Sequence, residues 1–181
     1  QWFISMESHG LRDKALKAID NTDFYPSKGK ERIKSMIETR PDWCVSRQRV
    51  WGVPLPIFIS KKTGNVLVDD EVFENIAKIY EKDGSDCWFN EDYQVFLGDK
   101  YKAEDYEKLS DIVEVWFDSG STHSFVLEKR DDLKWPASMY LEGSDQHRGW
   151  FHSSLLESCG TRGVAPFESI LSHGFVVDGK G

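Results

Sequence analysis

Short apolar runs typical of strands alternate with a helical pattern in residues 109–181. The strand-like runs cover residues 112–117, 139–141 and 170–177, and the helical pattern covers residues 149–158. Strands and helices that alternate at this spacing predict an α/β fold with a parallel sheet. Ligands of such sheets bind beyond the carboxyl ends of the strands, where the strand order reverses. The residues just after Leu141 and the turn after Phe117 are therefore the expected positions of a site.

The first part of the chain contains a predicted amphipathic helix at residues 28–39. Ser27 stands at the N-cap position, apolar side chains recur at helical spacing, and Pro41 ends the segment. The apolar residues are Ile33, Met36 and Ile37. The exposed face carries basic side chains, which fit either a solvated surface or a local strip that faces RNA. These basic residues are Lys28, Lys30, Arg32 and Lys34.

Residues 60–108 are acidic, rich in loops and poor in chemical motifs. A hairpin is expected around their start, with strands at 55–59 and 66–68 and a glycine in the turn. A helix is expected from about Asp70 to Lys82, because apolar residues recur on one of its faces. The segment fits a small insertion, since catalytic-looking motifs resume only after it.

The bulk properties are typical of a soluble globular chain without a targeting segment. Of the 181 residues, 39% are apolar and 30% are charged, as in an ordinary folded domain. The net charge of −8 argues against a dedicated nucleic-acid module, because such modules concentrate Lys and Arg. No apolar run approaches the roughly 20 residues that cross a bilayer, so we expect no membrane contact. The expected location is the cytoplasm.

The cysteines and the chain ends carry further expectations. Cys44, Cys87 and Cys159 are far apart in the sequence and have no histidine at metal-ligand spacing. We expect reduced, structural thiols and no metal site, zinc included. The chain opens on Gln1 and closes on Gly181 directly after a strand-like run. It is therefore expected to be a piece of a longer protein.

The densest chemical motif runs from Leu141 to Trp150 and reads LEGSDQHRGW. A predicted strand leads here into a glycine, two carboxylates and an amide before a helix begins. The vicinal hydroxyls of a ribose need such acceptors, and Gly143 allows a flat base or a phosphate to approach the backbone. Two plainer roles are equally compatible with the sequence, namely Asp145 as a helix N-cap and Arg148 in a surface ion pair.

Successive motifs resemble blocks of the class I isoleucyl-tRNA synthetases. They are DWCVSRQRVWGVP at 42–54, VWFDSG at 115–120, EGSDQHRGWF at 142–151 and HGF at 173–175. Their order and spacing cover nearly the whole chain. The SRQR block is shared by the leucine, valine and isoleucine enzymes, whereas DQHRGW points to isoleucine.

The resemblance implies part of a Rossmann-type catalytic domain with a small α+β connective insertion. Residues 1–59 would be the catalytic segment that follows the editing domain, 60–108 the connective insertion, and 109–181 the second Rossmann-type segment. The family's His-Ile-Gly-His-type motif would lie upstream, and its Lys-Met-Ser-Lys-Ser loop just beyond Gly181. Neither motif is present in the chain. No complete set of catalytic residues is therefore expected, and the isolated piece is expected to be inactive.

The resemblance also assigns binding residues position by position. The residues expected around the adenylate are Glu142, Gly143, Asp145, Gln146, His173 and Gly174. Glu142 resembles the glutamate that binds the adenylate, and the next three resemble the positions around its ribose. The last two match the segment that flanks the adenine. For His173 the alternative is a hydrogen-bonded histidine of the core, although its place on a loop at a strand end favours binding.

Trp116 and Trp150 resemble the walls of the isoleucine side-chain pocket. Two rigid rings can hold a branched aliphatic chain and offer nothing to a polar one. The alternative is that both are ordinary core tryptophans. Asp118 and Ser119 would lie at the mouth of the same crevice.

Arg47 and Arg49 lie in a segment that also contains Trp43 and Trp51. Alternating arginines and aromatic rings can guide a single-stranded tRNA end by charge and stacking. They can equally brace the catalytic domain, with an arginine stacked on a tryptophan.

The implied parent enzyme is an ATP-dependent isoleucine–tRNA ligase. Its partners would be isoleucine, ATP and tRNA(Ile), with Mg²⁺ carried by the ATP. This piece would contribute positioning and electrostatics. Two alternatives remain open, a valyl-tRNA ligase fragment or a non-catalytic synthetase-like binding module. An exposed sheet edge in the isolated piece would favour self-association.

Overall fold

A computed structural model describes residues 1–181, and the chain divides into two compact units. The large unit consists of Trp2–Val45 and Val115–Gly181. The small unit consists of Ser46–Glu114 together with Gln1. Each unit has its own buried apolar cluster, so each is described by itself.

The large unit is built on a three-stranded parallel sheet with the order β2-β9-β8. Its strands are β2 (Asp23–Tyr25), β8 (Tyr140–Gly143) and β9 (Ser169–His173). Ile170 of β9 lies level with Phe24 on one side and Tyr140 on the other. The predicted α/β fold with a parallel sheet is therefore confirmed. Strand β2 was not predicted, because only Phe24 of its three residues is buried.

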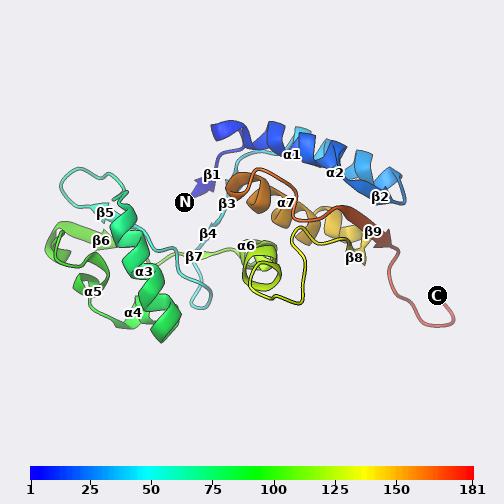
Figure 1. The fold of residues 1–181 in the computed structure, drawn as a ribbon. Helices are drawn as coiled ribbons and strands as arrows, with labels where there is room; N and C mark the ends of the chain where they lie inside the picture. The colour runs from blue at the N-terminus through cyan, green and yellow to red at the C-terminus, as the bar shows by residue number, and fades with distance from the viewer. The chain divides into compact units, whose positions relative to one another are not determined.

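Four helices pack together in the large unit, and three of them supply most of its buried core. The four are α1 (Leu11–Asp20), α2 (Lys28–Glu38), α6 (Val115–Gly120) and α7 (Trp150–Thr161). Helix α7 packs between α1 and α6, as Figure 1 shows. Because it has neighbours on several sides, every residue from Phe151 to Cys159 is buried. A helix that is buried all round has no strong amphipathic pattern.

Shorter elements complete the large unit. They are the antiparallel pair β1 (Phe3–Ile4) and β3 (Trp43–Cys44), the 3₁₀ helices η1 (Ser8–Gly10) and η4 (Ser144–His147), and the π-helical turn η3 (His123–Leu127). Element η4 links β8 to α7 and carries the central SDQH of the LEGSDQHRGW motif. The motif therefore lies between the carboxyl end of a strand and the start of a helix.

Two predicted helices of the large unit are confirmed. Helix α2 ends at Glu38, close to the expected 28–39. Ser27 is its N-cap residue, although the serine side chain makes no capping hydrogen bond. Helix α7 begins at Trp150, one residue after the expected start, and continues three residues past the expected end to Thr161.

The predicted strand at 112–117 is wrong in its second half. Only Ile112–Val113 form a strand, and residues Val115–Gly120 form helix α6. Apolar β-formers suggested a strand, but close packing against α7 decides the conformation. A Cβ atom on Gly120 would lie 2.8 Å from the carboxyl carbon of Glu157 and 2.9 Å from Oγ of Ser153. The turn expected after Phe117 is consequently part of a helix.

The predicted strand at 170–177 is too long. Strand β9 ends at His173, and the chain continues as an extended tail (Figure 1). Phe175, Val176 and Val177 are 76%, 90% and 64% exposed. These residues have apolar side chains but no neighbouring strand, so their β-propensity alone does not make a strand.

The small unit contains helices and two-stranded antiparallel sheets. Its elements are β4 (Ser46–Arg47), β5 (Phe58–Ser60), α3 (Asp70–Asp83), α4 (Cys87–Asn90), α5 (Tyr93–Leu97), η2 (Ala103–Asp105), β6 (Tyr106–Lys108) and β7 (Ile112–Val113). Strand β4 pairs with β7, and β5 pairs with β6. Its core is aromatic, with Trp88, Phe58 and Phe96 almost completely buried.

The predicted helix at 70–82 is confirmed as α3, with Asp69 as an N-cap that accepts from the N–H of Glu71. The predicted hairpin is present only in outline. Its turn is closed by the bond from Gly64 N–H to Ser60 O, but the second strand is reduced to a single bridge between Val66 and Ile59. The main partner of β5 is β6, a pairing that the local sequence does not indicate.

Candidate functional site

The carboxyl ends of β8 and β9 meet in the large unit. Gly143 is the last residue of β8, His173 is the last residue of β9, and the two are register partners. A Cβ atom on Gly143 would lie 3.9 Å from Cε1 of His173. Parallel pairing thus brings together two segments that the sequence resemblance had assigned to one adenylate site.

Both carboxylates of the motif lie against Gly143. Oε2 of Glu142 accepts a hydrogen bond from the N–H of Gly143 at 3.3 Å. Oδ1 of Asp145 occupies the space beside the glycine, 2.5 Å from where a Cβ would be. The missing side chain therefore makes room for a carboxylate, whereas the sequence suggested room for a base or phosphate. Glu142 and Asp145 are exposed and form no ion pair in the structure.

Gln146 connects the carboxylates to helix α7. Its Nε2 donates to Oδ2 of Asp145 at 2.9 Å, and its Oε1 accepts from the backbone N–H of Trp150 at 2.8 Å. The side chain thus orients the Asp145 carboxylate with one end and caps the first turn of α7 with the other. Asp145 itself is not the N-cap of α7, because Gly149 holds that position.

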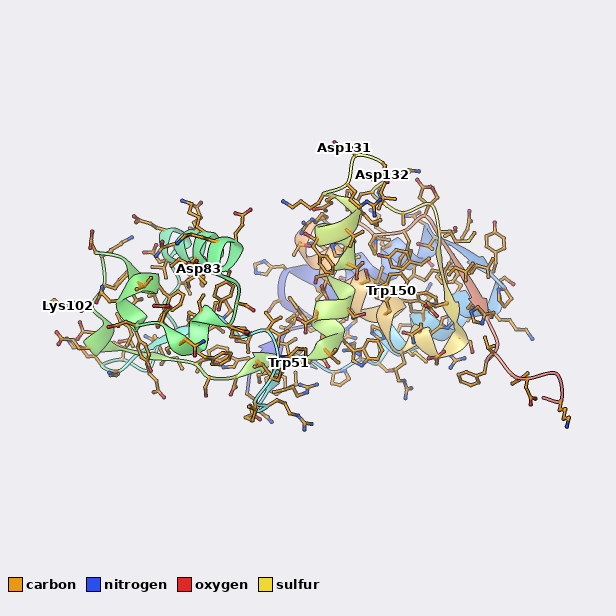
Figure 2. The ribbon with its side chains drawn as sticks, turned by 90° about the horizontal axis from the view of Figure 1, so that it is seen from below. Trp51, Asp83, Lys102, Asp131, Asp132 and Trp150 are labelled. Carbon is orange, nitrogen blue, oxygen red and sulfur yellow. The ribbon has the colours of Figure 1, made fainter.

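Trp150 is held on one ring face and at its indole nitrogen. Its ring stacks on Tyr140 with the ring centroids 3.9 Å apart and the planes 3° from parallel. Its Nε1–H donates to the carbonyl of Ser119 in α6 at 3.1 Å. Figure 2 labels Trp150 beside α6. The side chain is only partly buried, so the ring is fixed without being enclosed.

Trp116 lies on α6 and approaches the same turn. It is 40% exposed, and its ring carbon Cη2 would lie 2.9 Å from a Cβ on Gly149. Oε1 of Gln146 would lie closer still to the same Cβ atom. The structure therefore brings Trp116, Gln146 and Trp150 together around Gly149, and neither tryptophan is an ordinary enclosed core residue.

The remaining predicted site residues have smaller roles in the observed geometry. Gly174 is exposed, and its carbonyl lies 2.6 Å from Nδ1 of His173. The carbonyl of Asp118 accepts from Oγ of Ser121 at 2.8 Å. The carbonyl of Ser119 holds Trp150, as described above. Both carbonyls belong to a helix that the sequence had predicted to be a strand and a turn.

The histidines in and after the motif are parts of the core. His147 is 1% exposed, and its Nδ1 lies 2.7 Å from the carbonyl of Ser144. Burial lowers the pKa of His147, and burial together with the nearby Arg40 lowers the pKa of His152 to about 3. Both rings are consequently neutral near pH 7, which favours a structural role for them.

The aromatic and arginine-rich segment is divided between the units. Trp43 is 5% exposed in the large unit, where the Arg40 guanidinium lies 5.4 Å from its ring centroid. In the small unit, Arg47 forms an ion pair with Glu114 at 3.1 Å. Trp51 is 88% exposed on a loop of that unit (Figure 2). Arg47 is thus tied to a carboxylate of its own unit, whereas Arg49 and Trp51 are exposed.

Further properties bear on ligands and thiols. No group of three or more His, Cys, Asp or Glu side chains is arranged to hold a metal ion. The cysteines are free, and burial raises the pKa of Cys159 to about 12. No helix combines the length and the apolar character needed to span a bilayer.

The chain resembles known proteins along its whole length. A family model described as tRNA synthetases class I (I, L, M and V) matches residues 1–181. An isoleucine–tRNA ligase of Pelagibacter ubique is 84% identical over 181 residues, and one of Zymomonas mobilis is 54% identical over 190 aligned positions. One of Caldicellulosiruptor bescii is 53% identical over 186 aligned positions. Each match covers 100% of this chain but only 20% of the relative's length.

The family match extends over the whole chain, including the small unit and the site at the ends of β8 and β9. The predicted relationship to isoleucine–tRNA ligases is confirmed by the relatives' names. The chain belongs to the class I tRNA synthetases of the isoleucine, leucine, methionine and valine group.

Proposed function

We propose that this chain is the part of an isoleucine–tRNA ligase that positions the adenylate ribose and the isoleucine side chain. The observation that carries the proposal is the meeting of Glu142, Asp145 and His173 at the carboxyl ends of two parallel strands, next to the Trp116–Trp150 pair. The isoleucine–tRNA ligases that match the chain support the choice of amino acid. The chain spans about 20% of their length, so the activity belongs to a larger protein.

The adenylate half of the proposed site consists of acceptors and an open strand end. The side chains of Glu142, Asp145 and Gln146 offer oxygens to ribose hydroxyls or to the α-amino group of an amino acid. Gln146 already holds Asp145 in one orientation, which lowers the cost of ordering the site when a ligand binds. His173 and Gly174 would flank the adenine.

The proposed isoleucine half is apolar. A branched aliphatic side chain between Trp116 and Trp150 would bury its surface against two rings. The N–H of Trp150 is already bonded to Ser119, so this ring would offer the ligand its apolar face. A polar amino acid would lose hydrogen bonds with water and regain none. Such a pocket excludes polar amino acids strongly and valine only weakly.

The reaction proposed for the whole protein begins with attack of the isoleucine carboxylate on the α-phosphate of ATP. The new P–O bond gives isoleucyl-adenylate as the bond to pyrophosphate breaks. A hydroxyl at the 3′ end of tRNA(Ile) then attacks the aminoacyl carbonyl, and AMP leaves as the ester forms. Mg²⁺ would travel with ATP. The residues of this chain would lower the barrier by holding the reactants in register, without forming a covalent intermediate.

The remaining proposals concern the organisation of the chain. Residues 60–108 would be a connective insertion between catalytic segments 1–59 and 109–181, and the compact unit around them is longer, Ser46–Glu114. Exposed Arg49 and Trp51 support a role in guiding the single-stranded tRNA end. The open edge of β8 supports self-association of the isolated chain.

The decisive experiment changes the pocket wall in the full-length protein that contains this chain. Trp150→Ala should reduce kcat/KM for isoleucine in ATP–pyrophosphate exchange by about 30- to 1000-fold, corresponding to the roughly 2–4 kcal/mol of a buried aromatic hot spot. The preference for isoleucine over valine should also shrink. The matched control is Phe73→Ala, which removes a 38% exposed ring from α3 of the small unit.

The outcomes separate the alternatives. Unchanged isoleucine kinetics in Trp150→Ala would make Trp150 a structural residue and remove the pocket. A full-length protein that activates valine better than isoleucine would be a valyl-tRNA ligase. One that activates no amino acid would favour a binding module. The isolated chain is expected to show no exchange, and exchange abolished by Glu142→Ala would mean that the chain holds a complete site.

A further inference from the structure

We propose that Tyr140 is a positioning residue for the isoleucine pocket, because its ring fixes the ring plane of Trp150 from behind. The inference rests on the proposed function, which makes Trp150 a wall of that pocket. Tyr140 is the first residue of β8 and is 4% exposed, so it lies in the core and does not face the ligand. Its effect on isoleucine would pass through Trp150 alone.

The stack is tighter and flatter than the other aromatic contacts of the chain. Tyr140 and Trp150 have centroids 3.9 Å apart and planes 3° from parallel. The pair Tyr80–Trp88 of the small unit, by comparison, is 6.3 Å apart at 85°. A parallel stack blocks rotation of the indole about its Cβ–Cγ bond in a way that an edge contact does not.

Tyr140 is itself held on two sides. Its hydroxyl lies 3.1 Å from Oγ of Ser154, which is fully buried on α7. Its ring also packs against Phe167, with centroids 4.9 Å apart and planes at 59°. Burial raises the pKa of the phenol, so the hydroxyl stays protonated and can donate to the serine. The supporting ring is therefore rigid before any ligand arrives.

The remaining freedom of Trp150 is removed by hydrogen bonds. The indole N–H donates to Ser119 O, which fixes the in-plane orientation of the ring. The backbone N–H donates to Gln146, which fixes the start of α7. The ring face opposite Tyr140 is the one that the proposed function assigns to the ligand. The dispersion attraction between a methylene group and a ring falls steeply with distance. A small tilt of the Trp150 ring would therefore weaken the contact of the methylene group that isoleucine has and valine lacks.

The test compares Tyr140→Leu, Trp150→Ala and the double variant in the full-length protein. Tyr140→Leu should raise the KM for isoleucine roughly 3- to 10-fold, the equivalent of one aromatic pair, while the KM for ATP stays within about twofold. In the Trp150→Ala background the same change should have less than about a twofold effect on isoleucine, because the wall is already gone.

Two variants guard against a purely structural explanation. Tyr140→Phe keeps the stack and loses only the Ser154 contact, so its isoleucine KM should stay within about twofold of the parent value. Tyr80→Leu removes a tyrosine that packs on a tryptophan in the small unit, and it should leave the isoleucine KM unchanged.

The two proposals fail in different ways. If Trp150→Ala raises the isoleucine KM and Tyr140→Leu does not, Tyr140 has no positioning role and the pocket stands. If Tyr140→Leu and Trp150→Ala have additive effects, Tyr140 acts by another route and the inference is overturned. If Tyr140→Phe is as damaging as Trp150→Ala, the hydroxyl rather than the stack is responsible. If Trp150→Ala has no effect, the proposed function itself is wrong.

Discussion

The two units differ in what they bury. The small unit encloses a cluster of aromatic rings around Trp88, and its buried polar residues, Ser46 and Glu114, lie outside that cluster. The large unit buries polar groups along α7, namely His152, Ser153, Ser154, Glu157 and Ser158. All residues of the proposed adenylate and isoleucine site are also in the large unit. An apolar core is sufficient for folding, whereas the burial of polar side chains costs free energy and is more typical of a unit with a ligand site.

The largest effect is expected in the aromatic core of the small unit. Trp88→Ala should lower the free energy of unfolding of that unit by about 3–5 kcal/mol, because it removes a fully buried ring and its hydrogen bond to the carbonyl of Leu109. Urea unfolding followed by hydrogen exchange of each unit would measure this loss. The neighbouring Phe89 is 43% exposed, so Phe89→Ala is the matched control. Equal losses in the two variants would contradict the assigned core.

Acid should destabilise the large unit more than the small unit, because every histidine belongs to the large unit. Burial lowers the pKa of His123 and His147 and brings that of His152 to about 3. Between about pH 6.5 and pH 3 the unfolded chain binds more protons than the folded one, so stability falls as the pH falls through this window. For His152 alone the loss is roughly 3 kcal/mol at pH 4.

Each unit contains a buried thiol that can report this difference, Cys87 in the small unit and Cys159 in the large one. Labelling with a disulfide reagent that works in acid should modify Cys159 increasingly below about pH 6, with a smaller change at Cys87. His152→Gln should make the response of Cys159 shallower. Parallel labelling of both thiols at all pH values would show that the histidines do not set the acid response.

The contact between α6 and α7 gives the smallest of these effects. Gly120→Ala should destabilise the large unit by about 1–3 kcal/mol, because its Cβ would meet the side chains of Glu157 and Ser153. Gly160→Ala is the control on the other side of α7, where a Cβ would lie 3.7 Å from Leu11 and fit without strain. That variant should be neutral or more stable by about 0.5–1 kcal/mol. Thermal unfolding would rank the two, and the reverse order would refute the packing argument.

The sequence predicted the parts of the fold that have a strong local pattern. Helices α2 and α3 have one apolar face, and β8 and β9 are the apolar runs on either side of α7. It did not predict β2, which contributes one buried side chain, or the helical state of 115–120, which depends on the contact of Gly120 with α7. Both depend on residues that are remote in the sequence.

The same distinction holds for the site. Glu142, Asp145 and Gln146 were predicted because a motif places acceptors after a strand, and the structure brings them together around Gly143 and Trp150. The support from Tyr140 was not predicted, since nothing in the local sequence indicates that α7 folds back to stack Trp150 on the first residue of β8. The requirement for glycine at position 149 was not predicted either. A side chain there would collide with Trp116, which lies on another helix.

The pairing of β4 with β7 has a consequence for the order of folding. Strand β2 is synthesised early, yet its partner β9 follows only after the whole small unit, which at about 5–20 residues per second is a delay on the order of ten seconds. In that interval the small unit can fold, and the register of Ser46 with Val113 brings its two ends side by side. A folded small unit thus shortens the loop between the two segments of the large unit to a few residues, which reduces the entropy lost when β2 and β9 finally pair.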